Sequence, residues 1–403
     1  MATITVTFAD FDSNQPYSAG DIVIVQDTAA NLEALTTVQI AELASGNADS
    51  INSLDDFINF SADQLAALAS TSITLDSSDF VQMIDTGANI GALSASDIAA
   101  IAAKGVAAIN PSDHALTFDI AQFQALGAMS VDSAATFTIA DSEASIEALS
   151  AGQIGALSLQ GVDFIDSTDD TLALTVAQYQ ALGSVQLTGS DTVTLADSGA
   201  HIAALSAAEF AALGTNGVDV IDASDDALAL TVAQYQALGA VTLTAGDDVT
   251  LSDTGANIAA LSAAAIGNLG GNGIDTIDAS DDALSLSVAQ YDALGSVALT
   301  SGDVVTLADS GANLAALTDT DFGNLVNIDV LNATDDALSL SVAQLNAIIG
   351  NSIALTPADT VTLSDTGANL AALSSVAISA LAGENVDVID ANDDALTLSL
   401  AQY

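Results

Sequence analysis

Paired aspartates recur at regular intervals along this chain, and they are the residues best suited to chemistry. Among 403 residues there are 53 acidic residues and one basic residue, Lys104, so the net charge is −52. Only six of the acids are Glu, which leaves 47 Asp. Because Ca²⁺ prefers about six to eight oxygen ligands, ranks of Asp without basic partners predict calcium sites.

The candidate calcium ligands lie at one Asp-rich corner in each half of a repeating unit. They are Asp169, Asp170, Asp191, Asp225, Asp226, Asp247, Asp248, Asp281, Asp282, Asp303, Asp335, Asp336, Asp359, Asp393 and Asp394. Stacked one strand spacing apart, such carboxylates repel by several kcal/mol at an effective dielectric near about 20. A second interpretation stays open, because Asp also forms Asx-turns that need no ion.

The repeating unit is visible in two columns of similar segments. VDFIDSTDD begins at Val162, VDVIDASDD at Val218 and IDTIDASDD at Ile274, at intervals of 56 residues. DTVTLADSGAH from Asp191 and DDVTLSDTGAN from Asp247 keep the same interval. Seven copies cover nearly the whole chain. We expect an N-terminal strand or cap segment over residues 1–20 and a single repeat solenoid over 21–403, truncated within a repeat.

Each unit divides into two halves, and each half reads as strand, Asp-rich turn, strand and short helix. The helix starts carry S/T-x-x-Q capping boxes. These pair Thr175 with Gln178, Thr231 with Gln234, Ser287 with Gln290, Ser341 with Gln344, and Ser399 with Gln402. Gly127, Gly183, Gly239 and Gly295 follow the helices where a left-handed residue closes them. We expect the Thr of a box to matter more than its Gln.

Such short helices cannot stand alone in water, and neither can two-stranded ribbons. Stacked coils resolve both problems, because neighbouring coils pair their strands and bury Leu, Ile, Val and Ala in one core. The sequence therefore predicts an α/β solenoid of stacked strand-turn-strand-short-helix coils, with parallel β ladders and seven double repeats of about 56 residues.

One segment carries a family resemblance. GGNGIDTID, from Gly270, fits the spacing G-G-x-G-x-D-x-U, where U is a large apolar residue, and it resembles the calcium-binding nonapeptide of the RTX-type secreted proteins of Gram-negative bacteria. The resemblance implies that Asp275 is a calcium ligand, together with Asp163, Asp219 and Asp387 in the same column. In that family the nonapeptides run in tandem, whereas here the motif comes once per repeat, so the family's β-roll is not implied.

The wider pattern, with LTVAQYQALG and TLADSGANLAAL in an acidic, Cys-free chain, looks like the repeat regions of large type I-secreted surface proteins. S-layer proteins and adhesins are among these. The resemblance spans the chain, and it implies a place on the bacterial cell surface.

Other polar columns favour structural roles. Asp197, Asp253, Asp309 and Asp365, in DSGAN and DTGAN blocks, are expected to be helix N-caps. The Gln column is expected to cap helices, and Tyr179, Tyr235 and Tyr291 to pack in the core or a groove. His114 and His201 stand in columns filled elsewhere by Asp or Asn, so they do not indicate catalysis.

Composition limits the classes of function. The absence of Cys excludes disulfides and thiolate metal sites, and the absence of a basic patch argues against nucleic acid as a partner. The N-terminus lacks the basic and apolar regions of a cleavable signal, and the apolar stretches are too short for membrane insertion.

We therefore expect a non-enzymatic, calcium-stabilised extracellular structural protein of the bacterial cell surface. It would self-associate into a surface layer, fibre or matrix, and a cell-surface polysaccharide is a further candidate partner. Two alternatives stay open: the spacer or binding region of a secreted adhesin, and the non-catalytic part of a secreted polysaccharide-active enzyme.

Overall fold

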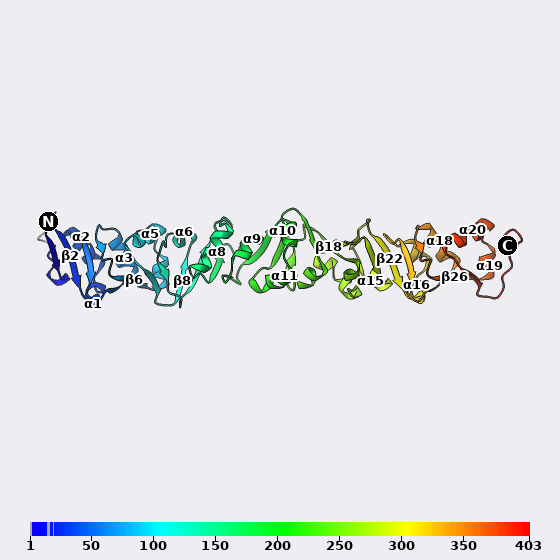
Figure 1. Ribbon diagram of the computed structural model, residues 1–403, viewed down its shortest axis with the longest axis horizontal. Coiled ribbons are helices and arrows are strands. Elements are labelled where there is room, and N and C mark those ends of the chain that lie inside the picture. Colours follow the sequence, from blue (N-terminus) through cyan, green and yellow to red (C-terminus); the bar gives the residue numbers. More distant parts are fainter. Residues whose placement is uncertain (1, 14–16, 19) are drawn as a thin grey trace. The chain divides into compact units, whose positions relative to one another are not determined.

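The computed structural model describes residues 2–13, 17–18 and 20–403. Packing divides the chain into two compact units, Met1–Ala196 with Thr215–Asp219, and Asp197–Gly214 with Val220–Tyr403. Each unit repeats the same succession of short strands and short helices about every 56 residues (Figure 1).

The strands fall into three length classes. The longest are β2 (Ile22–Asp27), β6 (Phe80–Asp85), β10 (Thr136–Asp141), β14 (Thr192–Asp197), β18 (Asp248–Asp253), β22 (Val304–Asp309) and β26 (Thr360–Asp365). Four-residue strands open the first halves: β3 (Ser50–Ser53), β7 (Ala108–Pro111), β11 (Phe164–Ser167), β15 (Val220–Ala223), β19 (Thr276–Ala279), β23 (Val330–Ala333) and β27 (Val388–Ala391). Others follow the first-half turns: β4 (Phe57–Phe60), β8 (Ala115–Phe118), β12 (Thr171–Leu174), β16 (Ala227–Leu230), β20 (Ala283–Leu286) and β24 (Ala337–Leu340). The shortest open the second halves: β5 (Thr74–Leu75), β9 (Ser130–Val131), β13 (Gln186–Leu187), β17 (Thr242–Leu243), β21 (Ala298–Leu299) and β25 (Ala354–Leu355).

First halves end in one helix and second halves in two. The first-half helices are α3 (Ala62–Ala69), α6 (Ile120–Gln124), α9 (Val176–Ala181), α12 (Val232–Ala237), α15 (Val288–Ala293) and α18 (Val342–Gly350). The first helices of the second halves are α1 (Ala29–Glu33), α4 (Gly87–Gly91), α7 (Glu143–Glu147), α10 (Gly199–Ala203), α13 (Gly255–Ala259), α16 (Gly311–Ala315) and α19 (Gly367–Ala371). They are followed by α2 (Thr37–Ser45), α5 (Ala95–Ala103), α8 (Ala151–Leu159), α11 (Ala207–Leu213), α14 (Ala263–Gly267), α17 (Asp319–Gly323) and α20 (Ser375–Ala380). Short 3₁₀ turns are η1 (Phe8–Asp10), η2 (Gly214–Asn216), η3 (Gly270–Asn272) and η4 (Leu381–Glu384).

Parallel ladders join successive coils, as the sequence predicted. One unit contains the sheets β1-β2-β3-β5, β4-β6-β7-β9 and β8-β10-β11-β13, where β1 is Thr3–Val6. The other contains β16-β18-β19-β21, β20-β22-β23-β25 and β24-β26-β27. In β20-β22-β23-β25 the first two strands come from one repeat and the last two from the next, so each sheet links two repeats. The predicted solenoid-like class is confirmed.

Like residues stack across these ladders and form the core. Leu286, Leu307, Leu331 and Leu355 are paired in register on consecutive strands, and all four are buried. The strands alternate buried and partly exposed residues, because side chains point to opposite faces of a strand. Burial of this continuous row of aliphatic side chains stabilises coils that would not fold alone.

The predicted helix signals are confirmed at most positions. Complete capping boxes are present at Thr175, Thr231, Ser287 and Ser341. At Ser399, Gln402 bonds the cap backbone nitrogen, but no helix follows it. The stop glycines Gly127, Gly183, Gly239 and Gly295 all have φ near +60°, the left-handed conformation.

One expectation about caps was wrong by a residue. The N-caps of α10, α13, α16 and α19 are Ser198, Thr254, Ser310 and Thr366, and each accepts a hydrogen bond from the amide three residues later. Asp197, Asp253, Asp309 and Asp365 each precede the cap. The hydroxyl serves the helix, and the carboxylate is left for other partners.

In the predicted N-terminal segment, β1 pairs in parallel with β2, and η1 follows it. Residues 1, 14–16 and 19 of that segment lie outside the described part of the chain. In the described part, no helix is both long enough and apolar enough to cross a bilayer.

Candidate functional site

The first acid of each first-half corner caps a helix in the preceding coil. Asp281 Oδ1 accepts a hydrogen bond of 2.8 Å from the amide of Gly255, the first residue of α13. The same bond recurs throughout this column, made by Asp169, Asp225, Asp335 and Asp393, and also by Asp55 and Asp113. A carboxylate at a helix N-terminus satisfies an unpaired amide and interacts favourably with the helix dipole. These acids therefore join neighbouring coils.

Gly255 shows how closely the coils approach at this point. A Cβ atom on Gly255 would overlap the carbonyl oxygen of Ala283 in the next coil. The glycine in the DTGAN block is therefore explained by packing against the neighbouring backbone, which lets the Asp281 carboxylate reach the helix start.

The second acid of each first-half corner is a turn residue. Asp170, Asp226, Asp282, Asp336 and Asp394 all have φ between 54° and 59°. Asp tolerates this left-handed conformation better than most residues. His114 has φ 57° and takes the same place in its own repeat, as its column predicted.

The acids of the second-half corners bind strand ends instead of helices. Asp303 Oδ2 accepts a hydrogen bond of 2.9 Å from the amide of Ala279, the last residue of β19. Asp191, Asp247 and Asp359 make the same bond to the ends of β11, β15 and β23. Sequence reasoning missed Asp79, which bonds Ser53 at the end of β3.

Unlike the first-half corners, the second-half corners are buried. Asp191, Asp303 and Asp359 are 6%, 6% and 4% exposed, and in each the other carboxylate oxygen, Oδ1, is buried without a hydrogen-bond partner. Burial raises the pKa of Asp303 against the effect of the Ala279 amide, and the charges of Asp278, Asp282 and Asp281 raise it further. The pKa values of Asp79, Asp247 and Asp359 are raised chiefly by burial as well.

In one repeat, both the donor and the acceptor of this bond are missing. Pro111 ends β7, at the position held by Ala279 in β19, and proline has no amide hydrogen to donate. The residue 24 positions later, where Asp303 stands relative to Ala279, is the buried Ala135. The acid is thus absent where its donor is absent, which indicates that the second-half acids are matched to the strand-end amide.

In this fold, the segment that resembles a calcium nonapeptide lies just after helix α14. Gly270 to Asn272 form η3, and Gly273 has φ +87°. Asp275 Oδ2 accepts a hydrogen bond of 2.9 Å from the amide of Val249 in β18. Asp163, Asp219 and Asp387 make the equivalent bond to Phe137, Val193 and Val361. Asp248 lies at the exposed start of β18, in register with Ala227.

The acids before the helix caps each bridge two helix starts. Asp253 Oδ1 accepts bonds from the Thr254 amide and the Asn257 side chain, and Oδ2 accepts one from the Val232 amide at the start of α12. Burial raises the pKa of Asp253, but these bonds outweigh it and hold the pKa below its ordinary value. Asp309 and Asp365 show the same shift for the same reasons.

The Gln column does more than cap its own helix. In addition to the capping bond to Thr231, Gln234 Nε2 donates to the carbonyls of Ala203 and Leu205, at 2.9 and 2.7 Å. The first carbonyl belongs to the last residue of α10 and the second lies two residues beyond it, so one amide group serves a helix start and the region where the previous coil's helix ends. The capping role was predicted, whereas the contact between coils was not.

Lys104, the chain's one basic residue, serves backbone carbonyls. Its Nζ donates to the carbonyls of Thr71 and Ile73, both at 2.7 Å, and burial lowers its pKa. The ammonium group of Lys104 thus binds carbonyls of the previous coil, and the carboxylates of the Asp columns bind backbone amides.

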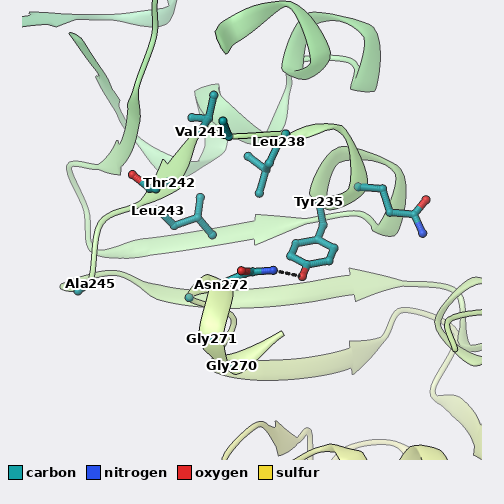
Figure 2. A pocket seen from close by; sticks show the side chains of 13 residues that line it. Tyr235, Leu238, Val241, Thr242, Leu243, Ala245, Gly270, Gly271 and Asn272 are labelled. Carbon is teal, nitrogen blue, oxygen red and sulfur yellow. Dashed lines mark hydrogen bonds between the residues drawn. The ribbon is translucent and has the colours of Figure 1, made fainter. Parts of the chain in front are cut away.

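A groove of about 650 Å³ lies beside η3 and is shown in Figure 2. Tyr235 lines it, and its hydroxyl accepts a hydrogen bond of 2.7 Å from Asn272 Nδ2. Leu238 and Val241 form apolar parts of the wall. The predicted groove packing of the Tyr column agrees with this placement, and Tyr179 makes the same bond with Asn216.

The structure brings the two corners of a repeat close enough to interact electrostatically, since Asp225 and Asp226 both raise the pKa of Asp247. Within the described ranges, no three His, Asp or Glu side chains converge as a ready-made metal site. The arrangement as it stands binds backbone amides, and it leaves buried carboxylate oxygens free at the second-half corners.

Comparison with known proteins shows no family for this chain. No family model matches this chain, and no curated protein matches it. A solved structure described as the crystal structure of a TDR receptor aligns with 96% of this chain and 69% of its own chain at 12% identity, with a TM-score of 0.19.

Proposed function

We propose that this chain is a calcium-stabilised extracellular structural repeat protein that assembles into a surface layer, fibre or matrix. The observation that carries the proposal is the repeated use of polar side chains to bind the neighbouring coil. Asp281, Asp303, Asp275 and Gln290 of one repeat all bond backbone groups of the preceding coil. Such a chain is suited to carrying load and to presenting a regular surface.

Electrostatics support the calcium part of the proposal. A net charge of −52 opposes both compact folding and the approach of a second copy. Divalent cations would relieve both effects, because they bind carboxylate oxygens and bridge acidic surfaces. A resident ion would act as a structural counter-charge held by carboxylates at the corners.

The first test is thermal unfolding in calcium and in chelator. A ligand that binds only the folded state adds about 2.7 kcal/mol per site when its concentration is 100-fold above its dissociation constant. Several sites would therefore raise the melting temperature steeply at millimolar Ca²⁺. An unchanged melt at low salt would remove calcium from the proposal.

The second test is light scattering with negative-stain microscopy at tens of micromolar protein. We expect a monomer in chelator and ordered chains or sheets with calcium, because the ion screens and bridges the acidic surfaces. A monomer under both conditions would support the alternative, a spacer region of a secreted adhesin.

A further inference from the structure

We propose that calcium binds at the second-half corners, through the Oδ1 atoms of Asp191, Asp303 and Asp359, and that the repeat containing Ala135 has no such site. The inference deepens the proposed function and rests on it. It selects one column from the many acids of the chain.

The two oxygens of each of these carboxylates differ in their hydrogen-bond partners. In Asp303 the Oδ2 atom accepts the Ala279 amide, whereas Oδ1 is buried and has no hydrogen-bond partner. Asp191 and Asp359 repeat this pattern with Ser167 and Ala333. A buried carboxylate oxygen without a partner is costly, so its recurrence at equivalent positions indicates a ligand.

Other negatively charged side chains surround these carboxylates. The acids that act on Asp303 are Asp278, Asp281 and Asp282, and those that act on Asp359 are Asp335 and Asp336. Like charges around a buried carboxylate attract a cation. Calcium suits such a place, because it accepts several carboxylate oxygens and completes its coordination with water.

The threonine three residues before each of these acids is not the missing partner of Oδ1. Thr300 and Thr356 precede Asp303 and Asp359 by three residues, but they donate to the carbonyls of Ile277 and Leu331. Thr188 differs, since its hydroxyl lies 2.8 Å from both Asp166 Oδ1 and Asp191 Oδ2 and its one hydrogen can serve either. In both cases Asp191 Oδ1 stays without a partner.

The other acid columns do not meet these conditions. Asp281 is exposed to solvent, which satisfies a carboxylate at little cost. Asp275 is exposed as well, and both carboxylate oxygens of Asp253 accept hydrogen bonds. Of the calcium ligands expected from the sequence, Asp191, Asp303 and Asp359 alone combine burial with a carboxylate oxygen that has no hydrogen-bond partner.

The experiment is equilibrium dialysis of the whole chain with ⁴⁵Ca²⁺, giving the number of ions bound per chain. Asp303→Asn keeps an oxygen for the Ala279 amide and removes the charge, and we expect it to bind one ion fewer than the wild type. The matched control is Asp292→Asn. This exposed acid of α15 stands where Gln236 stands in α12, and its variant should bind as many ions as the wild type.

A gain of function gives a second readout, should Asp303→Asn disturb folding. The double variant Pro111→Ala, Ala135→Asp supplies both the amide and the acid in the repeat that lacks them, and it should bind one ion more than the wild type. Circular dichroism in chelator checks that each variant keeps its fold.

The outcomes separate the two proposals. If the wild type binds calcium and assembles, but Asp303→Asn binds as many ions, the second-half corners are not the site and the proposed function stands. If the wild type binds no calcium, the calcium part of the proposed function and the present inference fail together.

Discussion

The two corners of each repeat use the same residue in different environments. At the first-half corner, Asp281 is exposed and caps a helix start, so its charge is satisfied by an amide and by water. At the second-half corner, Asp303 is 6% exposed and satisfies a strand-end amide with one oxygen only. The comparison teaches that burial, and not residue type, decides which carboxylates of this acidic chain need a further partner.

The largest effect is expected in the repeat with Pro111 and Ala135, where a buried Asp can be tested with and without its strand-end amide. Ala135→Asp alone would bury a carboxylate opposite a proline, without an amide donor, and should destabilise the protein by about 3 kcal/mol in chelator. Adding Pro111→Ala supplies the donor, so the double variant should recover about 2 kcal/mol. Urea denaturation of the wild type, both single variants and the double variant measures the coupling.

Additive effects of the two substitutions on the free energy of unfolding would contradict this view. If the two substitutions couple by less than about 0.5 kcal/mol, the acid and the strand-end amide are not matched. The absence of Asp at position 135 would then be unrelated to Pro111.

A smaller effect is expected where one side chain serves two coils. The sequence suggested that Gln234 matters less than Thr231. From the structure we expect the opposite order, because Gln234 donates two bonds to the previous coil in addition to accepting the bonds from its own cap. Thr231→Ala should cost about 1 kcal/mol, as for an ordinary N-cap. Gln234→Ala should cost about 2 kcal/mol, because it also leaves two carbonyls without partners.

Chemical denaturation ranks these variants, with the exposed Gln236→Ala as a control that should stay within about 0.5 kcal/mol of the wild type. Because solenoid stability is close to a sum of nearest-neighbour terms, hydrogen exchange in Gln234→Ala should rise near α10 and α12. A uniform rise along the chain would argue against stacked coils that interact locally.

The smallest effect is expected from pH, because two groups of acids oppose each other. Asp247, Asp303 and Asp359 have pKa values raised above the ordinary 3.8, so the folded state binds protons more readily than the unfolded state. The stability they add is present below pH 3.8 and is lost as pH rises through their folded pKa values. On acidification from neutral pH, these groups therefore stabilise the fold.

Asp253, Asp309 and Asp365 act in the opposite sense. Their pKa values are lowered from 3.8, so their stabilising bonds are present above 3.8 and are lost as pH falls through the folded values. In chelator, the melting temperature should rise as pH falls from 7 toward about 4, helped by the loss of net negative charge, and then fall. A melting temperature that declines steadily from pH 7 would show that the second-half acids do not carry raised pKa values.

The sequence determined the repeat, the fold class and most helix boundaries. Capping boxes and stop glycines act within a few residues, so Thr231 with Gln234 and the left-handed Gly239 could be recognised without coordinates. The columns of Asp were equally visible, and so was the place of His114 in one of them; the turn conformation that it shares with Asp226 was seen only in the structure.

Which partner each Asp has depends on the tertiary structure. The bonds of Asp281 to Gly255 and of Asp303 to Ala279 join residues 26 and 24 positions apart, and they depend on how one coil is placed on the next. The same is true of the free Oδ1 of Asp303, because burial of an atom depends on all the chain around it. Local sequence fixes a turn or a cap because its energy is local, whereas the environment of a carboxylate is set by coils that meet only after folding.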